Sequence, residues 1–175
     1  MSIKRVITLV WILLVSGCQY FEVQSGQLSS IITAFSSESE ALLNEPWRVE
    51  FGGYSAAVQP VITDEATVFV NNLDAIWFDG WSIIKVSGLN SFIPAWEIQD
   101  SGNERAFVVN GRVVAKHQCD PWLKYEIEGG VRFEQQCLGE QAYTNTILVG
   151  SLGQIISAEQ VVDSTFKVMR LLLNE

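Results

Sequence analysis

The chain has 175 residues, of which 48% are hydrophobic, and 20 acidic side chains against 11 basic ones give a formal net charge of −9 at pH 7. An acidic surface argues against nucleic acid and anionic lipid as electrostatic partners. The length is that of one domain, large enough to bury a sizeable core.

The N-terminus has the pattern of a secretory signal. Lys4 and Arg5 precede an apolar run over 6–15, and small residues follow at Ser16 and Gly17. The run is too short to cross a bilayer as a helix, which takes about 20 residues. We therefore expect residues 1–17 to be a signal peptide that is removed.

The cut site is more specific than that of an ordinary signal. Val15–Cys18 (Val-Ser-Gly-Cys) resembles the bacterial lipobox, in which the cysteine thiol receives a lipid before cleavage. The resemblance implies that Cys18 is lipidated (the palmitate class of modification) and that several acyl chains hold the protein stably at a membrane. The next residue, Gln19, is not the Asp that retains such proteins at the inner membrane, which implies an outer-membrane protein facing the periplasm. The alternatives are an uncleaved anchor or a plain signal peptide with a chance cysteine.

The chain that follows divides into a tether and one domain. Residues 18–26 are predicted to be a tether, and 27–175 a single β-rich periplasmic domain. At the start of the domain, apolar residues recur at helical spacing between Gln27 and Leu43, and Pro46 ends this region. We predict an N-terminal helix that packs on the body; a docking helix for a partner is the alternative.

From Trp47 onward the pattern is that of short strands with frequent turns. Asp79-Gly80 and Asn110-Gly111 are typical of tight two-residue hairpin turns, in which both residues have positive φ. The last strand is predicted to point Phe166 and Val168 inward. The whole is mainly β: an antiparallel meander, as a barrel or a sandwich. The predicted strands are 47–51, 54–62, 66–70, 75–78, 81–86, 105–109, 112–116, 123–127, 131–134, 141–149, 153–161 and 164–173.

Two cysteines remain after Cys18. Folding 123–136 as a hairpin brings Cys119 to Cys137, and in an oxidising compartment an even pair predicts a disulfide. A metal site made of His117 and these two cysteines is the alternative, but its spacing is not a standard one for zinc.

Few residues suggest catalysis. His117 is the one histidine, no Gly-x-Ser-x-Gly elbow accompanies it, and we predict it at the surface or half-buried on a strand. Asp74, Asp79, Glu97 and Asp100 are candidates for a hydrolase pair, but two acids are expected by chance in so acidic a chain. We expect no enzyme, no catalytic residue, no metal and no cofactor.

Aromatic residues are numerous, and a β core accounts for most of them. Trp77, Trp81 and Trp96 are also candidates for stacking on sugar rings, as are the less favoured Trp47 and Trp122.

Two segments resemble the YjbF-type lipoprotein family, whose members are encoded with capsule and exopolysaccharide export genes. Residues 79–89 (Asp-Gly-Trp-Ser-Ile-Ile-Lys-Val-Ser-Gly-Leu) are similar to a family strand that follows a turn glycine, although Trp81 replaces the usual Arg. Residues 143–145, 153–155 and 160 resemble the closing hairpin, with Ala158 in place of Ser. The resemblance implies a β-rich lipoprotein that supports polysaccharide secretion and carries over no catalytic residue.

Together these features predict a non-enzymatic envelope lipoprotein, an accessory in capsule or exopolysaccharide assembly or export. Its partners would be the membrane, through the N-terminal lipid, and a polysaccharide or envelope export proteins, with no nucleic acid. A structural or interaction lipoprotein of another envelope or secretion complex is the alternative, and a small periplasmic hydrolase is less favoured.

Overall fold

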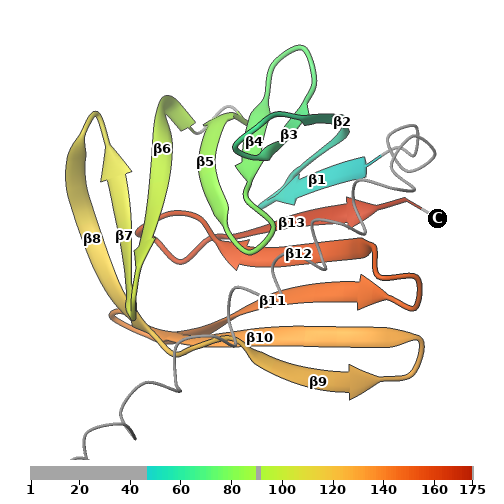
Figure 1. Cartoon of the computed structure of the whole chain (residues 1–175). Coiled ribbons are helices and arrows are strands. Elements are labelled where there is room, and N and C mark those ends of the chain that lie inside the picture. Colours follow the sequence, from blue (N-terminus) through green and yellow to red (C-terminus); the bar gives the residue numbers. More distant parts are fainter. Residues whose placement is uncertain (1–46, 90–91, 175) are drawn as a thin grey trace, which may run out of the picture.

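The computed structural model describes residues 47–89 and 92–174, which form one antiparallel sheet of 13 strands (Figure 1). The predicted signal peptide, tether and N-terminal helix lie outside these residues. The strands are β1 (Trp47–Phe51), β2 (Tyr54–Ile62), β3 (Thr67–Val70), β4 (Ala75–Phe78), β5 (Ile83–Gly88), β6 (Phe92–Ser101), β7 (Glu104–Val109), β8 (Arg112–Cys119), β9 (Leu123–Ile127), β10 (Gly130–Leu138), β11 (Ala142–Gly150), β12 (Ile155–Val161) and β13 (Val168–Leu173).

The sheet closes on itself as a barrel. Neighbours along the chain pair from β1 to β8 and from β10 to β13, β13 pairs with β1, and β8 pairs with β10. Twelve strands thus form the barrel, while the extra strand β9 pairs with β10 alone among the described residues. The predicted mainly β, antiparallel fold is confirmed, and it closes as a barrel.

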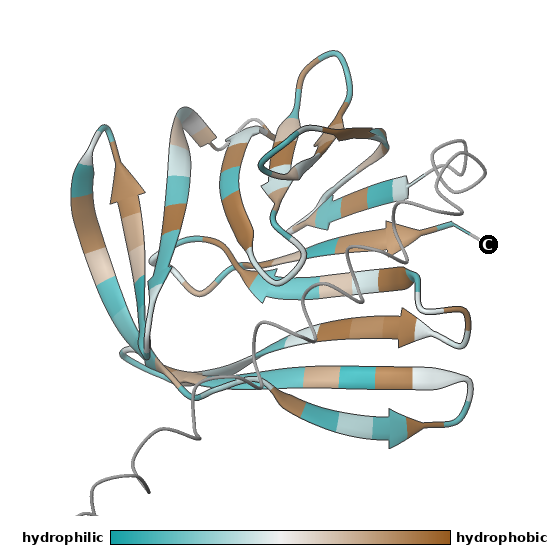
Figure 2. Ribbon diagram, in the orientation of Figure 1, coloured by the Kyte–Doolittle hydropathy of each residue, from teal (hydrophilic) through white to brown (hydrophobic). Residues whose placement is uncertain are grey.

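The core follows from the two-residue period of the strands, because alternate side chains point to the same face of a sheet. In β1 the buried residues Trp47, Val49 and Phe51 alternate with more exposed ones. Apolar and polar residues alternate along many of the strands (Figure 2). Aromatic side chains from different strands meet inside, where the ring centroids of Trp47 on β1 and Phe69 on β3 are 4.8 Å apart.

The two predicted X-Gly turns differ. Asn110 and Gly111 have φ of 51° and 71°, as the sequence predicts. At Asp79-Gly80 only Gly80 has positive φ, so the prediction of a two-residue turn is wrong there. The Asp79 carboxylate instead accepts hydrogen bonds from the backbone N–H groups of Trp81 (2.8 Å) and Ser82 (2.7 Å). This local capping delays β5 to Ile83 and leaves Trp81 outside the strand ladder.

The predicted inward face of the last strand is wrong at Val168. Phe166 has φ of 60° and lies in the loop before β13, so the alternation starts again after it. The Asp163 carboxylate holds this loop by accepting hydrogen bonds from the backbone N–H groups of Thr165 and Lys167. As a result Met169 and Leu171 are buried in the barrel, whereas Val168 is exposed.

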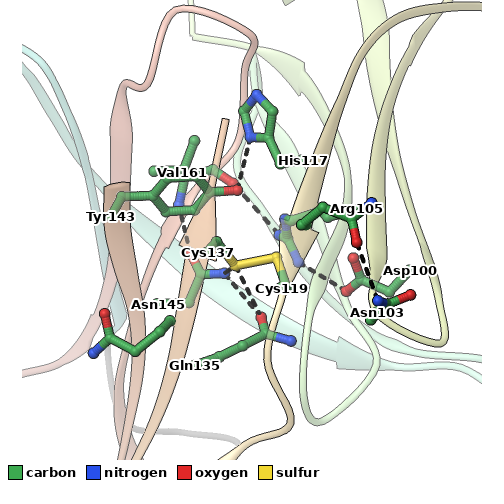
Figure 3. The surroundings of a disulfide bond; sticks show 12 residues. Asp100, Asn103, Arg105, His117, Cys119, Gln135, Cys137, Tyr143, Asn145 and Val161 are labelled. Atoms are coloured by element: carbon green, nitrogen blue, oxygen red, sulfur yellow. Dashed lines mark hydrogen bonds and ion pairs between the residues drawn. A yellow bond between two sulfur atoms is a disulfide. The ribbon is translucent and has the colours of Figure 1, made fainter. Parts of the chain in front are cut away.

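The barrel closes at a short seam. β8 and β10 are in register at two pairs, Cys119 with Cys137 and Gln118 with Leu138. The first half of β10 pairs with β9 instead. The two cysteines form the predicted disulfide, with their Cα atoms 4.0 Å apart and both side chains buried (Figure 3). The covalent bond therefore lies where the barrel has few backbone hydrogen bonds to hold it closed.

Replacing both cysteines (Cys119→Ala/Cys137→Ala) should lower the free energy of unfolding by about 2–4 kcal/mol, because the closed loop constrains the unfolded chain. Urea unfolding followed by tryptophan fluorescence measures this change. Wild-type protein unfolded with a reductant should approach the double variant, and equal midpoints for the variant and the oxidised wild type would contradict the prediction.

Candidate functional site

A fully buried arginine lies inside the barrel. Arg105 on β7 has 0% exposure. Its Nη1 donates to Oδ2 of Asp100 at 2.7 Å and to Oγ of Ser82 at 3.4 Å, and its Nη2 donates to Oε1 of Gln160 at 3.2 Å and the carbonyl oxygen of Val161 at 3.4 Å. A buried cation needs such partners, because desolvation without them is costly.

The hairpin of β6 and β7 positions the ion pair. Gly102, with φ of 62°, lies in the turn, and the register places Asp100 directly opposite Arg105 (Figure 3). The Asp100 side chain is 33% exposed, whereas Arg105 is not exposed. Ser82 also donates its hydroxyl hydrogen to Asp100. The network therefore reaches solvent at one carboxylate.

Gln160 connects this network to the loop before β5. The side chain is fully buried, and its Oε1 accepts from the backbone N–H of Ile83 at 3.0 Å as well as from Arg105. Its Nε2 donates to the carbonyl oxygen of Trp81 at 2.6 Å. Gln160 therefore hydrogen-bonds both Arg105 and the backbone of Trp81, and so links the buried arginine to this loop.

Three half-buried rings gather at this point, and we call Trp81, Trp122 and Phe133 the aromatic cluster. The ring centroids of Trp81 and Phe133 are 5.0 Å apart with an interplanar angle of 88°, and those of Trp81 and Trp122 are 5.7 Å apart. The rings come from the loop before β5, the link between β8 and β9, and β10. Aromatic surface that is partly open to solvent therefore lies beside the polar network.

The three predicted stacking tryptophans lie in different surroundings. Trp77 lies beside Lys85, whose Nζ is 5.1 Å from its ring centroid. Trp96 packs edge-on against Phe92 at 5.9 Å. The aromatic contacts among residues 47–89 and 92–174 join no two of the three. Of the three, only Trp81 belongs to the aromatic cluster.

His117 is buried, and its prediction at or near the surface is wrong. Its exposed fraction is 4%, its Nδ1 lies 2.8 Å from the Tyr143 hydroxyl, and its ring stacks on Phe166 at 5.0 Å. Burial, together with the positive charge of Arg105, lowers the pKa of His117, while Glu140 acts in the opposite direction. Burial raises the pKa of Tyr143 to about 12. The neutral His117 imidazole is enclosed by aromatic rings and contributes to packing inside the barrel.

The alternative metal site loses two of its ligands, because Cys119 and Cys137 are bonded to each other. In the part of the chain that the structure describes, no group of three His, Cys, Asp or Glu side chains could hold a metal ion.

The four candidate hydrolase carboxylates have separate partners. Asp74 accepts from the Tyr54 hydroxyl and from Asn71, and Glu97 pairs with Lys85 at 3.8 Å. The other two are Asp79, which caps its own turn, and Asp100, which holds Arg105.

No family model matches the chain, and no curated protein matches it. Among solved structures, the hypothetical lipoprotein YmcC from Escherichia coli (K12) has a similar fold, at a TM-score of 0.54 and 12% sequence identity. The likeness covers 90% of this chain and 97% of that one. Over the described residues, no helix is long and apolar enough to span a membrane.

Replacing the buried arginine (Arg105→Met) should cost about 2–3 kcal/mol of unfolding free energy. Breaking a buried pair costs about 3–5 kcal/mol, and the partial exposure of Asp100 reduces this figure. The tryptophan emission should also change, since Gln160 would lose a partner. Urea unfolding and fluorescence spectra measure both effects.

Arg170→Met is the matched control. Arg170 pairs with Glu159 at 3.0 Å on the outside, with 51% of its side chain exposed. An exposed pair contributes about 0–1 kcal/mol. Equal losses in the two variants would show that the buried network does not stabilise the barrel.

Proposed function

We propose that this chain is a non-enzymatic envelope lipoprotein, an accessory in the assembly or export of a capsule or exopolysaccharide, and that it binds the glycan at the aromatic cluster. In this proposal Cys18 carries the lipid that holds the protein at the outer membrane, with the β-barrel facing the periplasm. The observation that carries the glycan assignment is the half-buried cluster of Trp81, Trp122 and Phe133, in which Trp81 directly precedes Ser82, a hydrogen-bond donor to Asp100.

The chemistry of the cluster suits a sugar. Aromatic rings offer flat apolar surface against which the C–H faces of a pyranose can pack, and a few placed polar groups then fix the orientation. The Asp100 carboxylate has exposed surface to accept a hydrogen bond from a hydroxyl, while Ser82 and Arg105 hold it from inside. Arg105 is a positioning residue, because its own side chain has no exposed surface.

Independent features support the envelope location. The disulfide suits an oxidising compartment such as the bacterial periplasm. YmcC, whose solved structure has a similar fold, is named a hypothetical lipoprotein, and the lipobox-like Val15–Cys18 resembles a lipidation site. The resemblance of residues 79–89 to YjbF-type lipoproteins connects this segment with polysaccharide export, although Trp81, the centre of the aromatic cluster, stands where that family usually has Arg.

Replacing the lipid acceptor (Cys18→Ala) should abolish labelling of the protein by radioactive palmitate and leave an unlipidated, slowly processed precursor. The wild-type chain should be recovered in the outer-membrane fraction after cell lysis, because several acyl chains give stable attachment. Normal processing and membrane attachment of the variant would refute the lipid anchor.

Trp81→Ala and Trp122→Ala should each weaken binding of the purified capsular or secreted polysaccharide of the producing cells by about tenfold, the effect of losing one stacking surface of roughly 1–2 kcal/mol. Titration followed by tryptophan fluorescence measures the affinity. Trp77→Ala is the matched control, because Trp77 contacts Lys85 outside the aromatic cluster and should bind as the wild type does.

The same variants separate the two leading functions in cells. Deletion of the gene should reduce secreted and capsular polysaccharide, and Trp77→Ala should restore it better than Trp81→Ala. An unchanged polysaccharide level, with no fluorescence response to the glycan, would overturn the proposal in favour of an envelope protein whose partners are other proteins.

A further inference from the structure

β9 is an open edge of the sheet. Among the described residues it pairs only with β10, so its other side has no strand partner there (Figure 1). All five of its residues are exposed. Unpaired edges of this kind accept a further strand, and proteins commonly protect them with charge, a bulge or a short length.

The two faces of β9 have different chemistry. Leu123, Tyr125 and Ile127 lie on one face and are 51%, 40% and 38% exposed. Lys124 and Glu126 lie on the other face, and their side chains are 2.6 Å apart. Arg132 of β10 lies over the Tyr125 ring, with its Cζ 5.8 Å from the ring centroid, but all three apolar side chains keep 38–51% of their surface exposed within the described part of the chain.

The turn of the hairpin determines which backbone groups point outward. Ile127 is opposite Gly130, so the loop has two residues, Glu128 and Gly129. The pair that flanks a two-residue loop is hydrogen-bonded, and bonding alternates along the strand. The backbone N–H and C=O groups of Lys124 and Glu126 are therefore directed away from β10.

We propose that β9 pairs with β9 of a second copy of this chain, antiparallel, around a two-fold axis at Tyr125. In this register Lys124 lies opposite Glu126 of the partner subunit, and the outward backbone groups of both residues bond across the axis. Leu123 lies opposite Ile127 of the partner subunit on the other face. Opposite charges and apolar side chains in direct cross-strand positions stabilise such pairing.

Charge complementarity is the reason to choose a second copy as the occupant. The strand reads apolar, basic, aromatic, acidic, apolar, so a two-fold axis at its centre matches every position with a suitable one. Moving the axis to Lys124 or Glu126 places like charges opposite each other. Because the chain has a net charge of −9, two copies repel each other. Pairing of Lys124 with Glu126 of the partner subunit neutralises the charges at the interface, so the repulsion is removed there.

The interface is small, so the dimer is expected to be weak in dilute solution and is best trapped covalently. In full-length protein, Tyr125→Cys should form a disulfide-linked dimer under mild oxidation, because Cα atoms of a non-bonded cross-strand pair are about 4.5 Å apart, within disulfide range. Leu152→Cys is the control, with 78% exposure outside β9. The dimer yield should be about tenfold higher for Tyr125→Cys than for this control, a ratio that corresponds to about 1.4 kcal/mol.

Charge reversal tests the register in the Tyr125→Cys background. Lys124→Glu should lower the yield about tenfold, since two like-charge pairs replace two opposite ones. Adding Glu126→Lys should restore it. Lys116→Glu, on the exposed pair with Glu104 of β7, should leave it unchanged.

Three results would overturn the proposal. Equal yields at positions 125 and 152 would reflect random collision. A Tyr125→Cys crosslink to a different protein would assign the edge to that protein. A thiol introduced at position 125 that resists alkylation in the monomer would assign the edge to another segment of the same chain.

Discussion

One buried cation determines the arrangement of the barrel interior. Arg105 has no exposed surface, so its charge must be neutralised inside the protein, where both Nη groups have acceptors and Nε has none among the described residues. The acceptors come from β6, from the loop before β5 and from β12, segments that are distant in the sequence. Packing these segments around the guanidinium fixes Gln160, which in turn holds the backbone at Trp81. The position of the aromatic cluster therefore depends on Arg105, and its three rings remain partly open to solvent.

The second constraint is closure of the barrel. β8 leaves the register of β10 after two pairs, and the first half of β10 pairs with β9. The same hairpin that carries Cys137 to Cys119 also carries β9 out of the closed ring. The disulfide and the open edge are therefore two consequences of one geometric fact: strand β10 is longer than the part of β8 with which it pairs.

Local chemistry made much of this fold predictable. Period-two alternation located most strands, and the 123–136 hairpin was enough to predict the disulfide. Two errors arose where a side chain competed with the backbone pattern: Asp79 capped its own turn, and Phe166 took positive φ before β13. The alternation also missed β6 (Phe92–Ser101) entirely. Asp100 lies on β6, a strand that the alternation did not predict, so its pairing with Arg105 was not predicted either, and burial of the arginine depends on closure of the whole barrel. For the same reason Trp81 could be named as a candidate from the sequence, whereas its grouping with Phe133 could not.

Trp122 connects the proposed glycan site with the proposed pairing of β9. This residue follows the disulfide at Cys119, belongs to the aromatic cluster, and immediately precedes β9. A ligand that orders the Trp122 ring would also restrict the backbone entering β9, and a second copy paired on β9 would restrict Trp122 in return. Coupling of this kind is reciprocal, because each ligand must change the affinity for the other by the same factor. If glycan binding strengthened the dimer, a long polysaccharide with repeated units would gain further from two clusters on one assembly, through the higher effective concentration of the second site.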